Sequence, residues 1–410
     1  MGAAAVRHGE RLKVLVPAYA CDAYDVGSGY CAFHWIKALS RFCDVTALVR
    51  RRRGRPCGTE GVANVQTVHF DEPGIYAKFT GLDRRFQAGY FQFVFRAYKW
   101  AKRETEARKW DLVHQITPGA LRYPSPMAYL GLPFVLGPAG GLHPYPKELA
   151  GALPKPPVEW LRAVDTMRMK VDPFFRGTLR RASRLLVFSR QAVETISPEF
   201  RDKCVITPDG GFEELPKETA RGSEGNTVEM LFVGRVEVVK GLKFLLKALK
   251  KVGKGRNWRL TIVGDGSDME YERRLAGELG LTERVRFEGR KPREQVNDYY
   301  LRADVFCLPS VREGSGLAVL EAMSYGLPVV VCDYAGPAAT VTEECGYKVP
   351  PAKEDEFVEG LAKAVVALVE SKELRLKMGA AARRRVEEEF IWEKRAERMT
   401  GIYRQILGGQ

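Results

Sequence analysis

Two glutamates flank a run of small residues in the stretch "SVREGSGLAVLEAMSYG". Glu313 and Glu321 are separated by seven residues, and residues 314–316 follow the first of them. A helix that begins near Gly316 would present free backbone N–H groups, which bind phosphate. Carboxylates repel phosphate, but they accept hydrogen bonds from hydroxyl groups. The pattern therefore predicts a ligand with phosphate in its middle and hydroxyls at both ends, as in a nucleotide-diphosphate sugar.

A pair of cations in "FVGRVEVVKG" strengthens this interpretation. Arg235 and Lys240 follow a predicted strand that ends at Val233. Arginine offers a planar fork of donors and lysine a compact point charge, so the two together suit a diphosphate. Alternatively, the two cations lie in an ordinary solvated loop. The two glutamates would then be a helix-capping residue, Glu313, and a helix-surface residue, Glu321. The combination of both motifs favours ligand binding.

The elements that must position these residues form two similar α/β halves. Predicted strands alternate with segments of helical spacing, which indicates parallel sheets covered by helices. Expected strands of the first half are 12–20, 44–49, 63–70, 111–116, 133–138, 184–189 and 204–207. Those of the second half are 228–235, 258–267, 284–289, 304–310, 327–333 and 347–350. Two such halves imply a cleft, with ligands at the carboxyl ends of the strands.

A Gly-, Glu- and Pro-rich stretch after Pro208 indicates the linker between the halves. We expect an acceptor-binding domain over 1–208, a nucleotide-sugar-binding domain over 209–390, and a final helix over 391–410. That helix places four residues on one face and should cross back to pack on the first domain. The four residues are Trp392, Ala396, Met399 and Tyr403.

The stretch "EGSGLAVLE" resembles the E-x7-E signature of retaining glycosyltransferases of family 4, which have the glycosyltransferase B fold. "FVGRVEVVKG" resembles the Gly-Arg…Lys-Gly element of that family, and "LPVVVCDYAGPAATVTEECGYKVP" resembles the segment that follows. The resemblance covers nearly all of the chain and is stronger in the second half. It implies an α/β protein with two Rossmann-like domains and a hexosyltransferase activity that uses a nucleotide-diphosphate sugar.

The resemblance also implies roles for residues of the second half. Arg235 and Lys240 would bind the diphosphate and stabilise the leaving phosphate, Glu313 would meet the transferred sugar, and Glu321 would meet the ribose. The other implied donor-binding residues are Gly234, Arg290, Lys291, Ser315, Gly316 and Leu317, of which Arg290 and Lys291 would lie near the base.

Three motifs of the first half are candidates for further contacts. "DVGSGY" resembles the family's glycine-rich loop, with Gly29 where many relatives have glutamate, and its alternative is an ordinary strand–helix turn. "DLVHQITPG" places His114 at a strand end, where the family has a sugar contact, although a lone histidine is more often a satisfied core residue. "GPAGGLHPYP" resembles a substrate-facing loop containing Gly140, Gly141 and His143, and its alternative is a surface loop.

The expected chemistry needs no metal and no other cofactor. Cations and helix-end amides can stabilise a departing diphosphate, and no Asp-x-Asp motif stands at an apt site. No carboxylate nucleophile is evident, so we expect retention by same-face attack, with the leaving phosphate taking the acceptor's proton. An epimerase acting on a nucleotide sugar is the alternative on the same fold. A dinucleotide oxidoreductase is disfavoured because Gly264 and Gly266 do not complete a GxGxxG pattern.

Composition limits the partners. The formal net charge of +14 favours anionic partners, but the basic residues are spread along the chain without a nucleic-acid-binding module. The eight cysteines form no CxxC pair, so a metal site or a disulfide framework is not expected. Neither a signal peptide nor a stretch of about 18 apolar residues is present, so we expect a cytoplasmic protein that is either soluble or peripheral on the inner face of the membrane.

The segment 91–103 has two interpretations, and they imply different acceptors. It has Phe91, Val94, Phe95 and Tyr98 at helical spacing beside a basic stripe of Arg96, Lys99 and Arg103. A helix packed on the first domain is the favoured interpretation. A helix on an anionic membrane surface is the alternative, in which case the acceptor would be a lipid-linked sugar rather than a free one.

Overall fold

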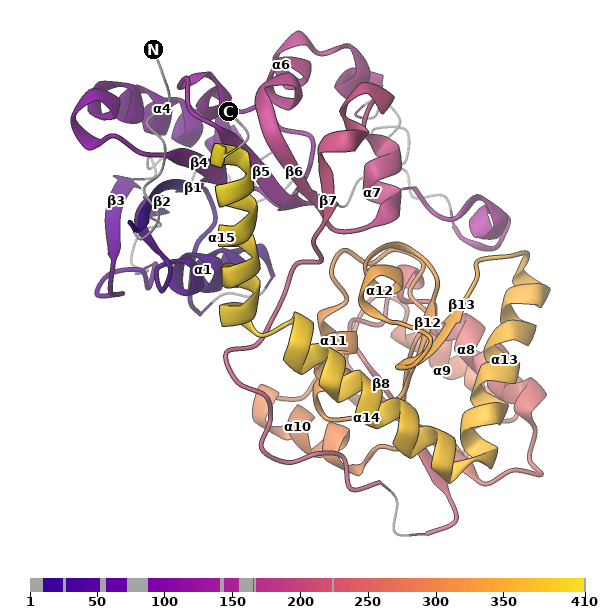
Figure 1. Ribbon diagram of the computed structural model, residues 1–410. Coiled ribbons are helices and arrows are strands. Elements are labelled where there is room, and N and C mark those ends of the chain that lie inside the picture. Colours follow the sequence, from indigo (N-terminus) through magenta and orange to yellow (C-terminus); the bar gives the residue numbers. More distant parts are fainter. Residues whose placement is uncertain are drawn as a thin grey trace. The chain divides into compact units, whose positions relative to one another are not determined.

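The structure, a computed structural model, describes residues 10–24, 27–51, 57–71, 88–140, 144–154, 165, 167–222 and 225–408. The chain divides into two compact units. The first comprises the described residues within Met1–Leu142, Leu161–Asp209 and Trp392–Gln410, and the second those within His143–Trp160 and Gly210–Ile391. Both units are parallel sheets with helices packed on them (Figure 1).

The first unit has a seven-stranded parallel sheet in the order β3-β2-β1-β4-β5-β6-β7. Its strands are β1 Leu12–Ala18, β2 Cys43–Arg51, β3 Val65–Asp71, β4 Leu112–Gln115, β5 Phe134–Ala139, β6 Ala182–Val187 and β7 Cys204–Ile206. Its helices are α1 Ser28–Leu39, α4 Ala88–Arg108, α6 Pro173–Arg181, α7 Arg190–Thr195 and α15 Trp392–Gly408, with short 3-10 turns η1 Pro126–Tyr129 and η3 Pro198–Lys203.

The central strand β1 is buried on both faces, as its apolar sequence requires in a parallel sheet. Successive side chains point to opposite faces of a strand. Val14 accordingly joins the core shared with α1 and α15, and Leu15 joins the core shared with α4 and α6. The sheet thus separates two hydrophobic cores.

The final helix α15 packs beside α1 on the first unit (Figure 1). Trp392, Ala396, Met399 and Tyr403 are all buried there in one core. The spacing of four apolar residues on one face therefore predicted both the helix and its buried side correctly.

The buried face of helix α4 coincides only in part with the stripe predicted from the sequence. Its buried face is formed by Tyr90, Phe93, Val94, Ala97 and Ala101. Phe91 and Phe95 are instead 38% and 54% exposed, on a surface shared with the exposed Arg96 and Lys99. The helix therefore packs on the first unit and still presents two aromatic rings to solvent.

The second unit has a six-stranded parallel sheet in the order β10-β9-β8-β11-β12-β13. Its strands are β8 Val228–Val233, β9 Trp258–Val263, β10 Val285–Gly289, β11 Val305–Leu308, β12 Val329–Cys332 and β13 Gly346–Val349. Its helices are α8 Leu242–Val252, α9 Met269–Glu278, α10 Arg293–Arg302, α11 Leu317–Ser324, α12 Ala335–Thr340, α13 Glu354–Glu370 and α14 Lys372–Glu389, with 3-10 turns η2 Lys147–Ala152 and η4 Val238–Lys240.

The segment 144–154 belongs to the second unit, although the expected boundaries placed it in the first domain. Leu149 and Leu153 are buried in the second unit's core. The Tyr334 hydroxyl donates to the Pro144 carbonyl at 2.9 Å, and the Lys243 ammonium donates to the Ala152 carbonyl. Apolar anchoring of two leucines explains why this part of the first half of the sequence packs on the second sheet.

Candidate functional site

The candidate site lies where the strand order of the second sheet reverses. From β8 the chain proceeds outward through β9 and β10 on one side, and through β11, β12 and β13 on the other. Ligands of open α/β sheets bind at such a switch point, outside the carboxyl ends of the strands. The segments that leave β8 and β11 at this edge contain Arg235, Lys240 and Glu313.

These two segments are fastened to each other by backbone contacts. The Ser310 hydroxyl and the Val311 N–H both donate to the Val239 carbonyl at 2.9 Å. Gly241 has a left-handed φ of 71°, and a Cβ atom there would lie 2.2 Å from the Pro309 carbonyl oxygen. Only glycine allows the two backbones to come this close. Packing at the site therefore requires a glycine at position 241.

Lys240 and Glu313 form an ion pair at this edge. Their side chains are only 13% and 18% exposed. The pair is therefore largely removed from solvent. Loss of either partner would leave the other as an uncompensated, mostly buried charge. The structure thus brings together two of the predicted site residues that stand 73 positions apart in the sequence.

The first turn of α11 starts at the same edge, directly after the small residues. Gly316 precedes the helix with a left-handed φ of 68°. Leu317 and Ser315 flank it and are half-buried. The first N–H groups of a helix have no partner within the helix, so this turn offers donors to an anion.

The loop before α11 is held by close contact with α12. The Gly336 N–H donates to the Glu313 carbonyl at 3.1 Å. A Cβ atom at Gly336 would lie 2.0 Å from the Gly314 carbonyl oxygen, nearer than real Cβ contacts. The backbone that carries Glu313 is therefore fixed by a second glycine, which the sequence analysis did not single out.

Glu321 is held by two residues that the sequence analysis missed. Its Oε1 accepts from Arg293 at 2.5 Å, and its Oε2 accepts from the Tyr300 hydroxyl at 3.0 Å. Tyr300 is fully buried, which together with Glu321 raises the pKa of its hydroxyl. The i, i+4 spacing of Val296 and Tyr300 on the expected helix indicates a shared face, but it does not identify Glu321 as the partner of Tyr300.

Segment 144–154 reaches the same loop through an aromatic contact. The Arg312 guanidinium lies 3.6 Å from the centre of the Tyr145 ring, a cation–π geometry. Arg312 directly precedes Glu313 in the sequence. Tyr145 is thus a second positioning residue that only the fold reveals.

Other predicted residues of the second half have contacts that do not involve Lys240 or Glu313. Arg235 is 72% exposed and pairs with Glu237 at 2.7 Å. Gly234 directly follows β8, and a Cβ atom at Gly264 would lie 1.8 Å from its carbonyl oxygen. Lys291 pairs with Glu288 at 3.1 Å beside the exposed Arg290, at the end of the edge strand β10.

His114 requires a correction, because it is completely buried in the first unit. Its Nε2 lies 2.7 Å from the Gly137 carbonyl, so Nε2 carries the proton, and its Nδ1 accepts from the Tyr403 hydroxyl at 2.5 Å. Burial lowers the pKa of His114 to about 4, so the ring is neutral at pH 7. Both nitrogens are satisfied within the core, so His114 is a core residue and not a sugar contact.

The glycines of the first unit have local structural roles. Gly29 is buried in the first turn of α1, and its carbonyl accepts from the Asp22 N–H at 3.1 Å. Gly140 lies so close to Phe188 that a Cβ atom there would be 2.6 Å from the ring. Gly141 and His143 lie outside the described residues.

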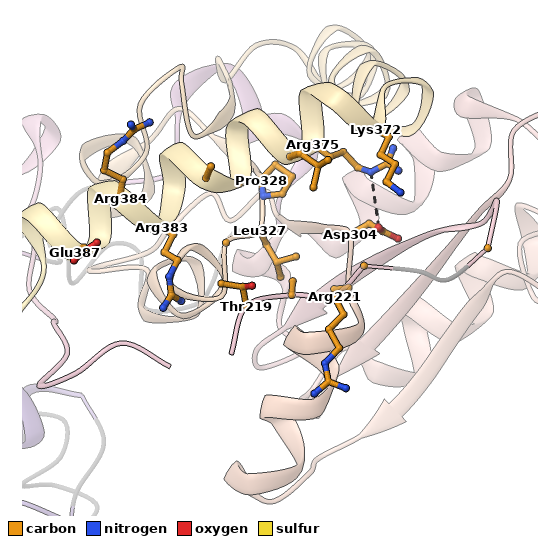
Figure 2. A pocket seen from close by; sticks show the side chains of 18 residues that line it. Thr219, Arg221, Asp304, Leu327, Pro328, Lys372, Arg375, Arg383, Arg384 and Glu387 are labelled. Atoms are coloured by element: carbon orange, nitrogen blue, oxygen red, sulfur yellow. Dashed lines mark ion pairs between the residues drawn. The ribbon is translucent and has the colours of Figure 1, made fainter. Parts of the chain in front are cut away.

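A cavity of about 440 Å³ lies at the opposite, amino-terminal edge of the second sheet (Figure 2). It is lined by the residues before β11 and β12 and by basic residues of α14. Arg375 pairs with Asp304 at 4.0 Å, and Arg383 donates to the Ser324 and Pro216 carbonyls at 2.5 and 2.8 Å. These bonds attach α14 to the unit, and the remaining arginines point away from a common centre (Figure 2).

The architecture matches solved structures over nearly the whole chain. A sucrose-phosphate synthase from Thermosynechococcus elongatus aligns with 98% of this chain and 100% of its own, at a TM-score of 0.65 and 20% identity. The chain has the glycosyltransferase B fold. The expectation of two Rossmann-like domains of this fold is therefore confirmed.

Sequence comparisons show that the second unit is similar to glycosyltransferases. Residues 213–385 match the model of the family described as glycosyl transferases group 1. An uncharacterized glycosyltransferase of Haemophilus influenzae is 34% identical over 53% of this chain and 60% of its own length. A GDP-mannose-dependent monoacylated alpha-(1-6)-phosphatidylinositol monomannoside mannosyltransferase of Corynebacterium glutamicum is 34% identical over 40% of this chain and 43% of its own.

The chain spans about half the length of the curated relatives it matches. The family match lies within the unit that contains Lys240, Glu313 and Glu321. Neither the family nor these relatives are named as epimerases, so that alternative finds no support here.

Proposed function

We propose that this protein transfers a hexose from a nucleotide-diphosphate sugar to a hydroxyl group of an acceptor. The observation that carries the proposal is the Lys240–Glu313 pair beside the start of α11, at the switch point of the second sheet. The match of residues 213–385 to glycosyl transferases group 1 supports it. So does the relative whose name specifies GDP-mannose as donor.

In this proposal the diphosphate lies between Lys240 and the first turn of α11. The backbone N–H groups of Ser315, Gly316 and Leu317 donate to phosphate oxygens, and the helix dipole favours the negative charge. When the donor binds, the Lys240 ammonium leaves the Glu313 carboxylate and pairs with a phosphate instead. Arg235, which is exposed and pairs only with the nearby Glu237 among the described residues, swings onto the other phosphate.

The two glutamates recognise the two ends of the donor. Glu313, freed from Lys240, accepts hydrogen bonds from the hydroxyls of the transferred sugar. Glu321 is oriented by Tyr300 and accepts from the ribose hydroxyls once the exposed Arg293 moves aside. Each carboxylate oxygen has room for a second donor, so the Tyr300 bond is kept.

The reaction breaks the bond between the anomeric carbon and the diphosphate oxygen and forms a bond to the acceptor oxygen. We propose attack on the same face, so that the configuration at the anomeric carbon is retained and the acceptor's proton passes to the leaving phosphate. Lys240, Arg235 and the α11 amides stabilise the departing charge in place of a metal ion.

A donor screen tests the proposal. Nucleotide-diphosphate sugars that raise the melting temperature are incubated with sugar and lipid-linked sugar acceptors, and both the released nucleoside diphosphate and the products are measured. We expect a glycosylated acceptor and one nucleoside diphosphate for each transfer, without added metal and in the presence of a chelator. Recovery of an altered nucleotide sugar with no diphosphate release would instead indicate an isomerase and would overturn the proposal.

A further inference from the structure

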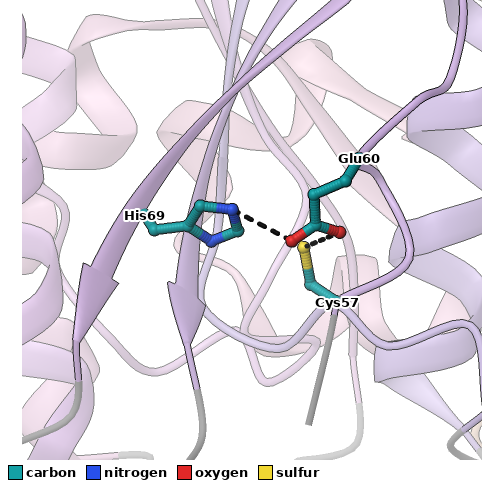
Figure 3. Close-up of side chains that lie close together, drawn as sticks. All are labelled: Cys57, Glu60 and His69. Atoms are coloured by element: carbon teal, nitrogen blue, oxygen red, sulfur yellow. Dashed lines mark hydrogen bonds and ion pairs between the residues drawn. The ribbon is translucent and has the colours of Figure 1, made fainter.

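A cluster of three side chains in the first unit combines ligand types that bind zinc. Cys57 and Glu60 lie in the turn region before β3, and His69 lies on β3 itself (Figure 3). One ligand atom from each residue lies within 4.8 Å of the other two. A thiolate, an imidazole nitrogen and a carboxylate oxygen are the three donor types found in protein zinc sites.

The cluster is preorganised by contacts between its members. The Cys57 thiol donates to Glu60 Oε2 at 3.3 Å, and His69 Nε2 lies 3.0 Å from Glu60 Oε1. Ligand atoms about 2.0–2.3 Å from a tetrahedral zinc are roughly 3.5 Å apart. The Sγ–Oε2 and Nε2–Oε1 separations of 3.3 and 3.0 Å are close to this spacing, and all three ligand atoms lie within 4.8 Å of one another.

The surroundings hold the ligands in place. Cys57 is 4% exposed, and Thr59, which is fully buried, lies 2.9 Å from its sulfur. Thr67 of β3 donates to the Thr59 hydroxyl at 3.0 Å. The imidazole of His69 is 16% exposed and presents Nε2 to the cluster, while its Nδ1 has no partner among the described residues.

We propose that Cys57, Glu60 and His69 form a zinc site with a fourth, exchangeable position. The ion would tie the turn at residues 57–60 to β3, which among the described strands is at the edge of the sheet and pairs with β2 alone. Its role is then to stabilise this margin of the first unit, separate from the donor site of the second unit. The thiolate excludes Ca²⁺ and Mg²⁺, which prefer oxygen ligands.

Binding releases the thiol proton as the Cys57 sulfur bonds to zinc. Metal affinity should therefore increase with pH. This dependence distinguishes a thiolate site from adventitious binding at surface carboxylates.

The test is titration of the full, metal-free protein with Co²⁺ followed by Zn²⁺. We expect one equivalent of Co²⁺ to give a thiolate-to-cobalt charge-transfer band, one equivalent of Zn²⁺ to abolish it, and zinc to raise the melting temperature reversibly with a chelator. Absence of the band in the wild-type protein would overturn the proposal without reliance on any variant.

Variants assign the ligands. C57S should abolish the charge-transfer band, and H69Q and E60Q should each weaken zinc binding by about 10–100-fold or more. The matched control is C204S, which removes a half-buried thiol of the same unit outside the cluster. A band that persists in C57S, or disappears in C204S, contradicts the assignment.

Discussion

Lys240 and Glu313 meet as an ion pair at the carboxyl edge of the second sheet, although they follow different strands. The pair places a cation and a carboxylate where the proposed donor needs a phosphate contact and a hydroxyl contact. Without donor each residue compensates the other's charge. Donor binding is therefore expected to separate them, and this exchange can be measured.

The K240A variant should lose transfer while keeping its fold. We expect kcat to fall by about 10²–10³, because a cation that stabilises the leaving phosphate is removed. The uncompensated Glu313 carboxylate should also repel the diphosphate. Transfer assays and nucleoside-diphosphate titrations measure both effects, with K250A on the exposed face of α8 as control.

The E313Q variant completes a double-mutant cycle. It should also lose transfer, and the double variant K240A/E313Q should bind nucleoside diphosphate more tightly than K240A, because the repelling charge is gone. Transfer at the wild-type rate in both single variants would refute the site. Equal diphosphate affinity in K240A and the double variant would refute the proposed exchange of partners.

A methyl group at Gly336 should distort the loop that carries Glu313. A Cβ atom there would lie 2.0 Å from the Gly314 carbonyl oxygen, so G336A forces the backbone to shift. We expect about 1–3 kcal/mol of lost stability and weaker donor binding. The control G277A lies on α9 of the same unit with open space around it and should be neutral or stabilising. Unchanged donor affinity in G336A would contradict the role of this contact.

Ionisation of Glu272 should make the second unit less stable above pH 7 than at pH 4.5. Burial, with nearby Asp268 adding to it, raises its pKa from 4.5 to about 7. The carboxyl group of Glu272 therefore binds its proton more tightly in the folded state than in the unfolded state. The stabilising effect of this protonation is lost as the pH rises from about 4.5 through 7. The loss amounts to about 3 kcal/mol.

The E272Q variant cannot ionise, so its unfolding free energy should fall less than that of the wild type between pH 4.5 and 8. Urea unfolding at several pH values measures the difference, and E270Q, on the exposed face of α9, is the control. Parallel pH profiles for wild type and E272Q would contradict the assignment.

The His114–Tyr403 bond should contribute to the stability of the first unit. Y403F removes the hydroxyl that donates to Nδ1 and leaves a buried acceptor unpaired, at a cost of about 1–3 kcal/mol. The exposed Tyr24 provides the control Y24F. Because burial lowers the pKa of His114 to about 4, its stabilising effect is full above about pH 6.5 and is lost as the pH falls through 4. Equal unfolding free energies for wild type and Y403F would contradict the inferred bond.

The outer surface of α4 should bind anionic membranes. Exposed Phe91 and Phe95 adjoin exposed Arg96 and Lys99, a combination suited to the lipid–water interface. Among the described residues, no helix is long and apolar enough to span a bilayer. We expect salt-sensitive binding to vesicles of anionic lipid, weakened about tenfold or more in F95S. The control Y24S removes an exposed aromatic residue elsewhere, and wild-type-like binding by F95S would exclude this surface.

Much of the fold follows from local patterns in the sequence. Alternating apolar strands and helical spacings define both sheets, since burial on two faces requires continuous apolar strands. Four apolar residues at helical spacing were enough to predict the buried face of α15. The stripe predicted on α4 was right only in part. Val94 is buried, but Phe91 and Phe95 are exposed, because aromatic residues surround this helix and spacing alone does not say which of them the sheet covers.

The candidate site follows from sequence only in part. The seven-residue interval between Glu313 and Glu321, and the glycine before α11, predicted where this helix begins, because helix starts are local structures. Arg293, Tyr300, Gly336 and Tyr145 were missed, since each acts through a neighbour that is distant in sequence.

The sequence by itself determined the α/β alternation, the helix start behind Glu313 and the apolar face of the last helix, because these depend on residues within a few turns of one another. Only the tertiary structure decided that Lys240 meets Glu313, that His114 is enclosed by Tyr403 and Gly137, and that Cys57, Glu60 and His69 converge. Contacts between residues from separate elements depend on strand order and side-chain packing, which local spacing does not specify.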